Sequence, residues 1–345
     1  MNHIAPSVND SAVESDAPAG RWNKPLPIET VRRLSALESW RSFGHIALEW
    51  SMVVAASVAC WQTLQWNLYA GLPVYLLTIL FIGGRQHALS VLMHEGSHYR
   101  LMKNRTANDF FTELFTAWPM HIAMRNYREH HFPHHRTPNT ADDPDWELRT
   151  QDESWEFPKT KAGLAKMFLF DFLGLRVVDQ WRTFGRYTFP HKRKRDWIDY
   201  VREVYTLTLI ATFTYFGLWI PYLLMWIVPM LTWLKVALRM RTIAEHYALD
   251  YGHMFRQTRT TYPSTLERIF IAPKNINYHL DHHLYPSVPF YHLRELHTEL
   301  LKTVEFRREA HITHGYTQVL RECLSPPASA GANVATECGE KRSAA

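Results

Sequence analysis

Apolar and polar positions are strongly segregated along the chain. Two nearly uncharged stretches cover residues 46–69, in which Glu49 is the one acid, and residues 74–93. Each has about the twenty residues that an α-helix needs to cross a bilayer. The short connection, residues 70–73, carries no charge, so we expect the two stretches to form a helical hairpin.

A second long apolar region covers residues 204–238 and contains Pro221. Because a proline ends one helix and can begin another, this region predicts spans at about residues 204–219 and 221–238. The alternative, buried helices of a soluble protein, is disfavoured by the length of these stretches. We therefore expect an all-α integral membrane protein with four transmembrane helices in two hairpins.

Charge predicts the orientation of these helices. The chain has 345 residues and a net charge of +5, and its Lys and Arg residues crowd the N-terminal arm, residues 100–202 and the region after Lys235. Both hairpin turns lack them, so the positive-inside rule places the basic regions and both termini in the cytoplasm. We expect a multi-pass protein of a bacterial inner membrane, with the endoplasmic reticulum as the alternative. The basic residues flank apolar stretches without a nucleic-acid-binding signature, which favours the lipid bilayer over nucleic acid as the anionic neighbour.

The same pattern predicts three regions. Residues 1–45 form an N-terminal cytoplasmic tail with a lead-in helix, residues 46–305 the membrane domain, and residues 306–345 a polar, partly disordered C-terminal tail. The mixed apolar segments 110–123 and 162–178 are too short or too charged to span, so we expect them to lie at the membrane surface.

Histidine is the compositional anomaly, with 20 residues in the chain. His94 and His98 are spaced i, i+4 and share one face of a helix at the end of the second predicted span. The run from 130 to 135 contains four histidines, and a third cluster repeats the HxxHH spacing of this run. Packing does not favour such clusters, because polar rings are costly to bury without a partner. A solvated surface patch is the alternative for any one cluster, but not for three on one predicted membrane face.

Eight imidazoles exceed the needs of a single metal, so two metals are implied. The three cysteines, Cys60, Cys323 and Cys338, are far apart and form no CxxC pair, so neither a zinc ribbon nor an iron–sulfur cluster is indicated. Nitrogen ligands suit iron, copper, zinc or nickel. We favour two irons, because redox-active metal at the mouth of a bilayer can activate dioxygen against an unreactive C–H bond.

The three clusters, HEGSH, HFPHH and HLDHH, resemble the histidine boxes of the membrane fatty acid desaturase and hydroxylase superfamily in order and spacing. The DDPD acids after the second box and the NYHLDHHLYP stretch are similar as well, and the resemblance covers about residues 46–297. It implies a four-span bundle with a cytoplasmic, histidine-rich di-iron cap. It also implies a set of metal ligands: His94, His98, His131, His134, His135, His279, His282, His283 and, after the last span, His246.

Some assignments stay open at this point. Either His130 or His131 can face the metal, since both fit the second box. Four acids are candidate acceptors for the N–H groups of ligand histidines, with solvated surface acids as the alternative: Glu95, Asp142, Asp145 and Asp281.

The resemblance implies an O2-dependent oxidoreductase that desaturates an aliphatic substrate, with a fatty acyl chain as first choice in a bilayer. Hydroxylation, oxidative decarboxylation to a terminal alkene, and desaturation of a small secondary metabolite are alternatives. Electrons must come from an external donor of the ferredoxin or cytochrome type, because the chain lacks an HPGG stretch, a ferredoxin cysteine set and a GxGxxG motif. A membrane metal transporter is the non-enzyme alternative, but the only charges within the first hairpin are Glu49 and Arg85.

Overall fold

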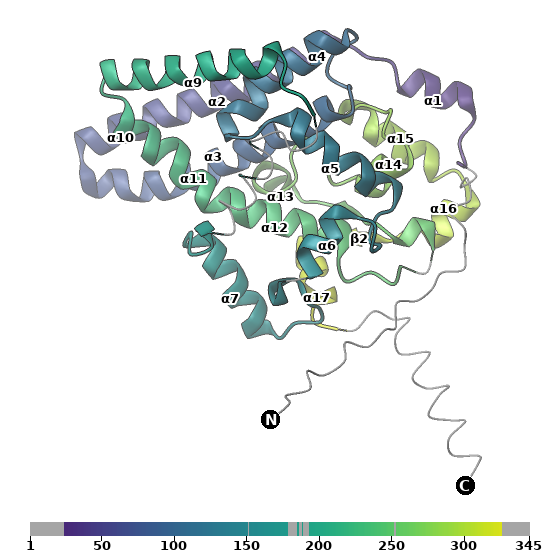
Figure 1. Cartoon of the computed structure of the whole chain (residues 1–345). Helices are drawn as coiled ribbons and strands as arrows, with labels where there is room; N and C mark the ends of the chain where they lie inside the picture. The colour runs from purple at the N-terminus through teal and green to yellow at the C-terminus, as the bar shows by residue number, and fades with distance from the viewer. Residues whose placement is uncertain are drawn as a thin grey trace, which may run out of the picture.

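The computed structural model describes residues 24–150, 152–178, 185, 188, 193–251 and 253–325. The predictions for most of the N-terminal tail, for the chain after Ser325 and for Cys338 lie outside these residues. The described chain is mostly helical (Figure 1), with one two-stranded parallel sheet, β1 (Thr260–Tyr262) and β2 (Ile312–His314), that an all-α prediction does not include.

The first hairpin consists of α2 (Ser39–Trp66) and α3 (Leu68–Ser97). The chain turns at Asn67, whose side chain accepts a hydrogen bond from the Ala70 N–H and so caps α3. The predicted turn at 70–73 is therefore already helix. Gly71 serves close packing instead, since a Cβ atom at this position would lie 2.7 Å from the Leu64 Cα atom of α2.

The second apolar region also turns earlier than predicted. Helix α9 (Trp197–Tyr215) is followed by Gly217 with φ +65°, and then by α10 (Trp219–Tyr222), η4 (Leu223–Ile227), α11 (Val228–Leu231) and α12 (Trp233–His246). Pro221 lies in the first turn of α10, where its missing N–H would have no helical partner anyway. The proline therefore begins a helix, and the glycine makes the turn.

Among the residues that the structure describes, three helices are long and apolar enough to cross a membrane: Ser39–Trp66, Leu68–Ser97 and Trp219–His246. Their apolar side chains are largely on the outside, since only 22% of the apolar window of the first is buried. Such exposed apolar surface is expected of helices in lipid. Helix α9 carries Asp199, Arg202 and Glu203 near its start and is not among the three, so the four-span count remains a prediction.

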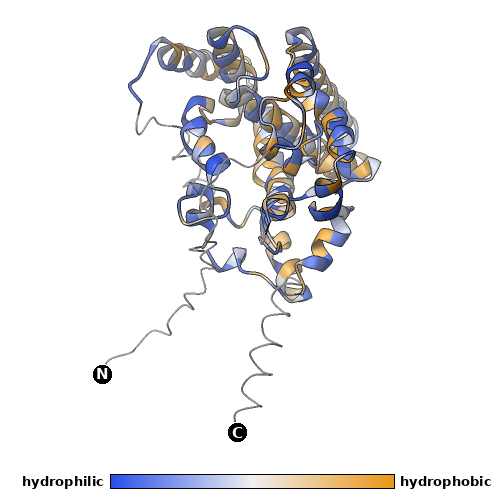
Figure 2. Cartoon of the chain, turned by 90° about the vertical axis from the view of Figure 1, so that its right-hand side faces the viewer, coloured by the Kyte–Doolittle hydropathy of each residue, from blue (hydrophilic) through white to orange (hydrophobic). Residues whose placement is uncertain are grey.

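The remaining elements form a cap at one end of the long helices (Figure 1). Viewed from this side, its hydrophilic and hydrophobic residues are interspersed (Figure 2). The described elements of the cap that precede α9 are α1 (Ile28–Leu34), α4 (Arg105–Thr112), η1 (Glu113–Ala117), η2 (Trp118–Met120), α5 (Met124–Arg136), α6 (Pro144–Thr150), η3 (Glu153–Trp155) and α7 (Lys161–Phe172). After α12 follow η5 (Met254–Arg256), α13 (Thr265–Phe270), α14 (His279–Leu284), η6 (Phe290–His292), α15 (Leu293–Leu300), α16 (Val304–Glu309) and α17 (Tyr316–Glu322).

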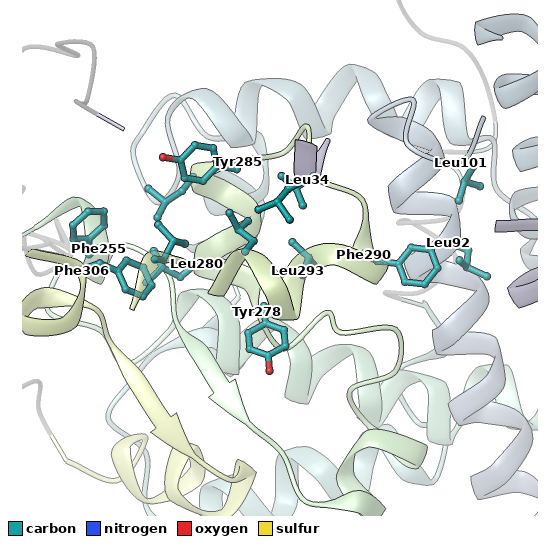
Figure 3. Packing of buried hydrophobic residues seen from close by; sticks show 14 of the residues in the cluster. Leu34, Leu92, Leu101, Phe255, Tyr278, Leu280, Tyr285, Phe290, Leu293 and Phe306 are labelled. Carbon is teal, nitrogen blue, oxygen red and sulfur yellow. The ribbon is translucent and has the colours of Figure 1, made fainter. Parts of the chain in front are cut away.

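A large apolar cluster joins the cap to the first hairpin (Figure 3). Leu280 and Leu284 of α14 pack there with Leu293 of α15 and with Leu92 of α3. Because the leucines of α14 are held in this core, the neighbouring histidines of the same short helix are turned toward the opposite side. This apolar cluster thus sets the orientation of the third histidine segment, residues 279–283.

The end of the described chain is also packed. The predicted boundary after residue 305 falls inside α16, and Tyr316, Val319 and Cys323 are buried against residues of α7 and α12. The division of the chain into three regions remains a prediction, but residues 306–325 contribute to the cap.

Candidate metal centre

The end of α3 supplies the first two histidines. His94 is in the last turn and His98 is the C-terminal capping residue, so both rings leave the helix where the apolar span ends. Gly96 lies between them, and a Cβ atom there would lie 2.3 Å from the Thr112 side chain. The glycine therefore lets α4 pack tightly against this end of α3.

Helix α5 supplies the second set. His131 and His135 are one turn apart and point to the same side of the helix, whereas His134 is displaced around the axis. The Tyr127 hydroxyl lies 3.0 Å from Nδ1 of His131, within hydrogen-bonding distance. The structure places His131, and not His130, among the converging rings.

The remaining four rings come from α14 and from the end of α12. His279, His282 and His283 lie on α14, and His246 is the last residue of α12. Asp281 anchors α14 from behind, since its carboxylate accepts hydrogen bonds from the Nδ1–H of His297 (2.7 Å) and the hydroxyl of Thr260 (2.6 Å).

All nine rings converge in two adjoining groups among the described residues. The first group contains His94, His98, His131, His135 and His282, and the second contains His134, His246, His279 and His283. Within each group the potential ligand atoms lie within 4.8 Å of one another. The groups meet where the rings of His135 and His283 stack, with centroids 4.2 Å apart.

The distances within each group fit metal coordination. Nε2 of His131 lies 2.8 Å from Nε2 of His98 and 2.9 Å from Nε2 of His135, and Nε2 of His246 lies 2.9 Å from Nε2 of His279. Nitrogen ligands bound at about 2.0–2.1 Å to one metal are about 3 Å apart. Five and four nitrogen donors without a thiolate suit a redox-active first-row metal.

Burial also prepares these rings for metal. Desolvation, followed by the neighbouring imidazoles, lowers the pKa of His131, His279, His282 and His283 well below the usual value and that of His135 to about 3. The rings are therefore neutral at pH 7, which is the form that binds metal. Both nitrogens of His94 and His282 are buried without a hydrogen-bond partner, which is costly, and a bound metal would satisfy one nitrogen of each ring.

One buried carboxylate orients a ring of the second group. Asp143 is 1% exposed, and its Oδ2 atom accepts a hydrogen bond of 2.8 Å from the Nδ1–H of His134. Burial by itself would raise the pKa of Asp143, but the bonds from His134 and from the backbone N–H groups of Asn139 and Asp145 outweigh it and lower the pKa. The ionised carboxylate thus fixes the tautomer that leaves Nε2 of His134 free to bind metal.

The four acids that the sequence suggested as acceptors for the ligand rings make other contacts or only approach a ring. Glu95 has Oε1 3.6 Å from Nδ1 of His94, while its Oε2 accepts the backbone N–H of Phe290. Asp142 is exposed, Asp145 pairs with Arg149, and Asp281 holds α14 as described.

Three residues that the sequence did not single out also lie against the rings: Asp143, Tyr127 and Glu245. Oε1 of Glu245 lies 3.3 Å from Nδ1 of His279 and accepts a hydrogen bond from Arg241. The one available signal was position: Asp143 lies within the DDPD run, and Glu245 precedes His246.

Most of the chain is similar in sequence to known proteins. The fatty acid desaturase family model matches residues 70–315, which is more than half of the chain. The chain is 26% identical over 282 residues to a dihydrorhizobitoxine desaturase of Bradyrhizobium elkanii, covering 77% of this chain and 78% of the relative. It is 25% identical to an sn-1 oleoyl-lipid 12-desaturase of Anabaena variabilis (66% and 69% covered) and 25% identical to a human sphingolipid delta(4)-desaturase/C4-monooxygenase (71% and 72% covered).

Proposed function

This chain belongs to the fatty acid desaturase family and is an oxidoreductase of the desaturase and oxygenase type, and from this premise we propose that it is a di-iron enzyme that uses dioxygen to desaturate an aliphatic substrate. A fatty acyl chain is the first choice. The observation that carries the proposal is the pair of adjoining imidazole groups at the end of helices apolar enough to cross a membrane.

The nine histidines are the proposed ligands, with one iron in each group. Two irons, when bound there, would supply the reductive activation of dioxygen that breaking an unactivated C–H bond requires. The protein's own part is to orient the rings and to keep buried ones neutral: Asp143 fixes His134, and burial keeps rings such as His135 unprotonated. Six of the nine rings, those of His94, His131, His134, His246, His279 and His282, are buried, which limits the access of bulk water to the centre.

The reaction needs an external electron source. Removing two hydrogens from a CH2–CH2 unit with one dioxygen consumes two further electrons and two protons and yields the alkene and two waters. No haem, flavin or iron–sulfur motif is visible in the sequence, so we propose a ferredoxin or cytochrome-type donor that docks on the basic cytoplasmic face. We further propose that the cap and both termini are cytoplasmic and that the protein resides in a bacterial inner membrane.

The substrate can differ from a membrane lipid. The relatives' names refer to dihydrorhizobitoxine, an oleoyl lipid and a sphingolipid, so related chains differ widely in substrate. One of them is also named a C4-monooxygenase, which favours hydroxylation as the second candidate reaction. The two reactions share the first hydrogen abstraction and differ in whether the substrate then loses hydrogen or gains oxygen.

Product analysis tests the proposal. Cells that express the wild type are compared with cells that express His282→Ala, and lipids, free acids, small metabolites and headspace volatiles are analysed by mass spectrometry. The proposal predicts a product that has lost two hydrogens only with the wild type; a product that has gained oxygen indicates hydroxylation, and a terminal alkene indicates decarboxylation. Identical profiles despite bound iron and an added electron donor would contradict it.

A further inference from the structure

Three charged side chains meet inside the protein, away from the histidines. Glu49 of α2 accepts a hydrogen bond of 3.1 Å from Arg85 of α3, and its other oxygen lies 2.5 Å from the Lys274 ammonium. The side chains are 1%, 9% and 8% exposed, respectively. Lys274 lies in the loop between α13 and α14, so one carboxylate joins three segments that are far apart in sequence.

This ion cluster holds the helices together at a high cost in desolvation free energy. Buried ion pairs often contribute no more stability than well-packed apolar residues of similar volume, because both charges lose their hydration. Charged groups inside an apolar helical hairpin are therefore a reason to look for function. Glu49 pairs with both cations, and Arg85 also donates to the Ile269 carbonyl, so the cluster is suited to holding position rather than to carrying an ion.

The loop that Lys274 anchors leads directly into the third histidine segment. Lys274 and Asn275 both have left-handed backbone conformations, with φ +56° and +58°, which non-glycine residues adopt only when their surroundings hold them there. The Asn275 side chain donates to the Phe290 carbonyl (3.0 Å), and five residues after Lys274 the chain reaches His279. Lys274 is thus the point at which this loop is tied to the first hairpin.

Helix α3 and α13 also touch closely beside the cluster. A Cβ atom at Gly84 would lie 2.8 Å from the Ile269 carbonyl oxygen, so only glycine permits this approach. The neighbouring Arg85 donates to the same carbonyl. The cluster therefore fixes the distance between α3, which carries His94 and His98, and the chain that enters α14.

Both imidazole groups depend on this distance. His282 of α14 joins the group that contains His94 and His98, while His279 and His283 join the other. Helix α14 has only six residues and is too short to hold its own orientation. We infer that Glu49, Arg85 and Lys274 form a positioning site that holds the third histidine segment in register with α3, so that both metal sites form together. This inference rests on the proposed di-iron function.

Lys274→Met tests the inference with little risk to folding. Met matches the Lys side chain as far as the Cε atom and, like Lys, has a Cβ atom at the left-handed position, so the change removes only the ammonium. Glu49 keeps Arg85 as its partner. The matched control is Lys302→Met, which removes an exposed lysine (64%) from a surface ion pair with Glu299. Lys274→Arg retains the charge and serves as the conservative variant.

The readout is metal binding by the purified full-length protein in detergent. Anaerobic Co²⁺ titration, followed by the visible absorption of the bound ion, reports both sites without any substrate or electron donor. We expect two ions in the wild type and in Lys302→Met, about 10-fold weaker binding with an altered spectrum in Lys274→Met, and recovery in Lys274→Arg. Thermal unfolding of the metal-free proteins checks that Lys274→Met remains folded.

Two outcomes overturn the inference. Either Lys274→Met binds two ions with wild-type affinity and spectrum, or Lys274→Arg binds as weakly as Lys274→Met although both metal-free variants unfold like the wild type. If the wild type itself fails to bind two ions, the proposed function fails instead, so the two failures can be told apart.

Discussion

Asp143→Asn removes the charge that orients His134 while keeping the size of the side chain. In the wild type, Oδ2 accepts from the Nδ1–H of His134 at 2.8 Å and from the Asn139 N–H at 2.9 Å, and Oδ1 accepts from the Asp145 N–H at 2.9 Å. An asparagine offers one acceptor oxygen in place of two, and that oxygen is neutral. His134 therefore loses a charge-assisted bond, or a backbone N–H loses its acceptor.

The expected size of the effect follows from this geometry. Replacing such a carboxylate behind a metal-binding histidine costs about 10–100-fold in metal affinity, or about 1.4–2.7 kcal/mol. Loss of one buried backbone hydrogen bond adds about 1–3 kcal/mol of destabilisation in the metal-free protein. The matched control is Asp142→Asn, because Asp142 is the preceding residue in the same run and is exposed.

The assay is anaerobic Fe²⁺ titration in competition with a chelator of known affinity, combined with thermal unfolding of the metal-free proteins. We expect Asp143→Asn to weaken binding of one of two irons and Asp142→Asn to remain within about twofold of the wild type. Equal losses in the two variants, or wild-type affinity in Asp143→Asn, would refute the role of Asp143.

Three further predictions concern packing, helix capping and pH. Gly96→Ala should lower the free energy of unfolding by about 1–3 kcal/mol in chemical denaturation, because the added Cβ atom would lie 2.3 Å from the Thr112 side chain. The control is Gly44→Ala, which should be neutral or stabilising because no atom lies within 4 Å of the added Cβ atom. Arg128→Met should cost about 1–3 kcal/mol and weaken metal binding, because Arg128 donates to the carbonyls of Gly96 and Ser97 beside His98; the exposed Arg308→Met should change neither denaturation nor metal titration. The metal-free protein should lose stability as the pH falls below about 6.5, because the histidines of the unfolded chain then bind protons, whereas buried rings such as His135, with a pKa of about 3, stay unprotonated in the folded state. The expected loss is about 1 kcal/mol per such ring between pH 7.5 and 5.5, and an unfolding temperature that does not change over this range would contradict the prediction.

The spacing of the histidines predicted that they lie together, but it did not predict which histidine belongs to which of the two groups. His134 and His135 are adjacent in sequence and belong to different groups, because consecutive residues of a helix point about 100° apart and α5 lies between the two groups. The assignment depends on how α5 meets α14 and α12, which is tertiary information. The choice of Asp143 over Asp142 and Asp145 depends on it in the same way.

Local sequence also located the apolar segments better than their turns. Gly71 and Pro221 suggested turns because these residue types commonly break helices, but Gly71 permits close packing and Pro221 begins a helix. Glu49 and Arg85 stood out in the sequence as charges within the first hairpin. Their partner Lys274 could not be foreseen, since it follows Arg85 by 189 positions and reaches the pair only through the fold.

The most direct test of the central claim is Mössbauer spectroscopy of the purified full-length protein loaded with ⁵⁷Fe, reduced anaerobically and then exposed to dioxygen. The account predicts two irons per chain with nitrogen-rich coordination that oxidise together to a magnetically coupled pair, and loss of this pair in His282→Ala. One iron per chain, or two irons that remain ferrous and uncoupled after dioxygen is added, would contradict it.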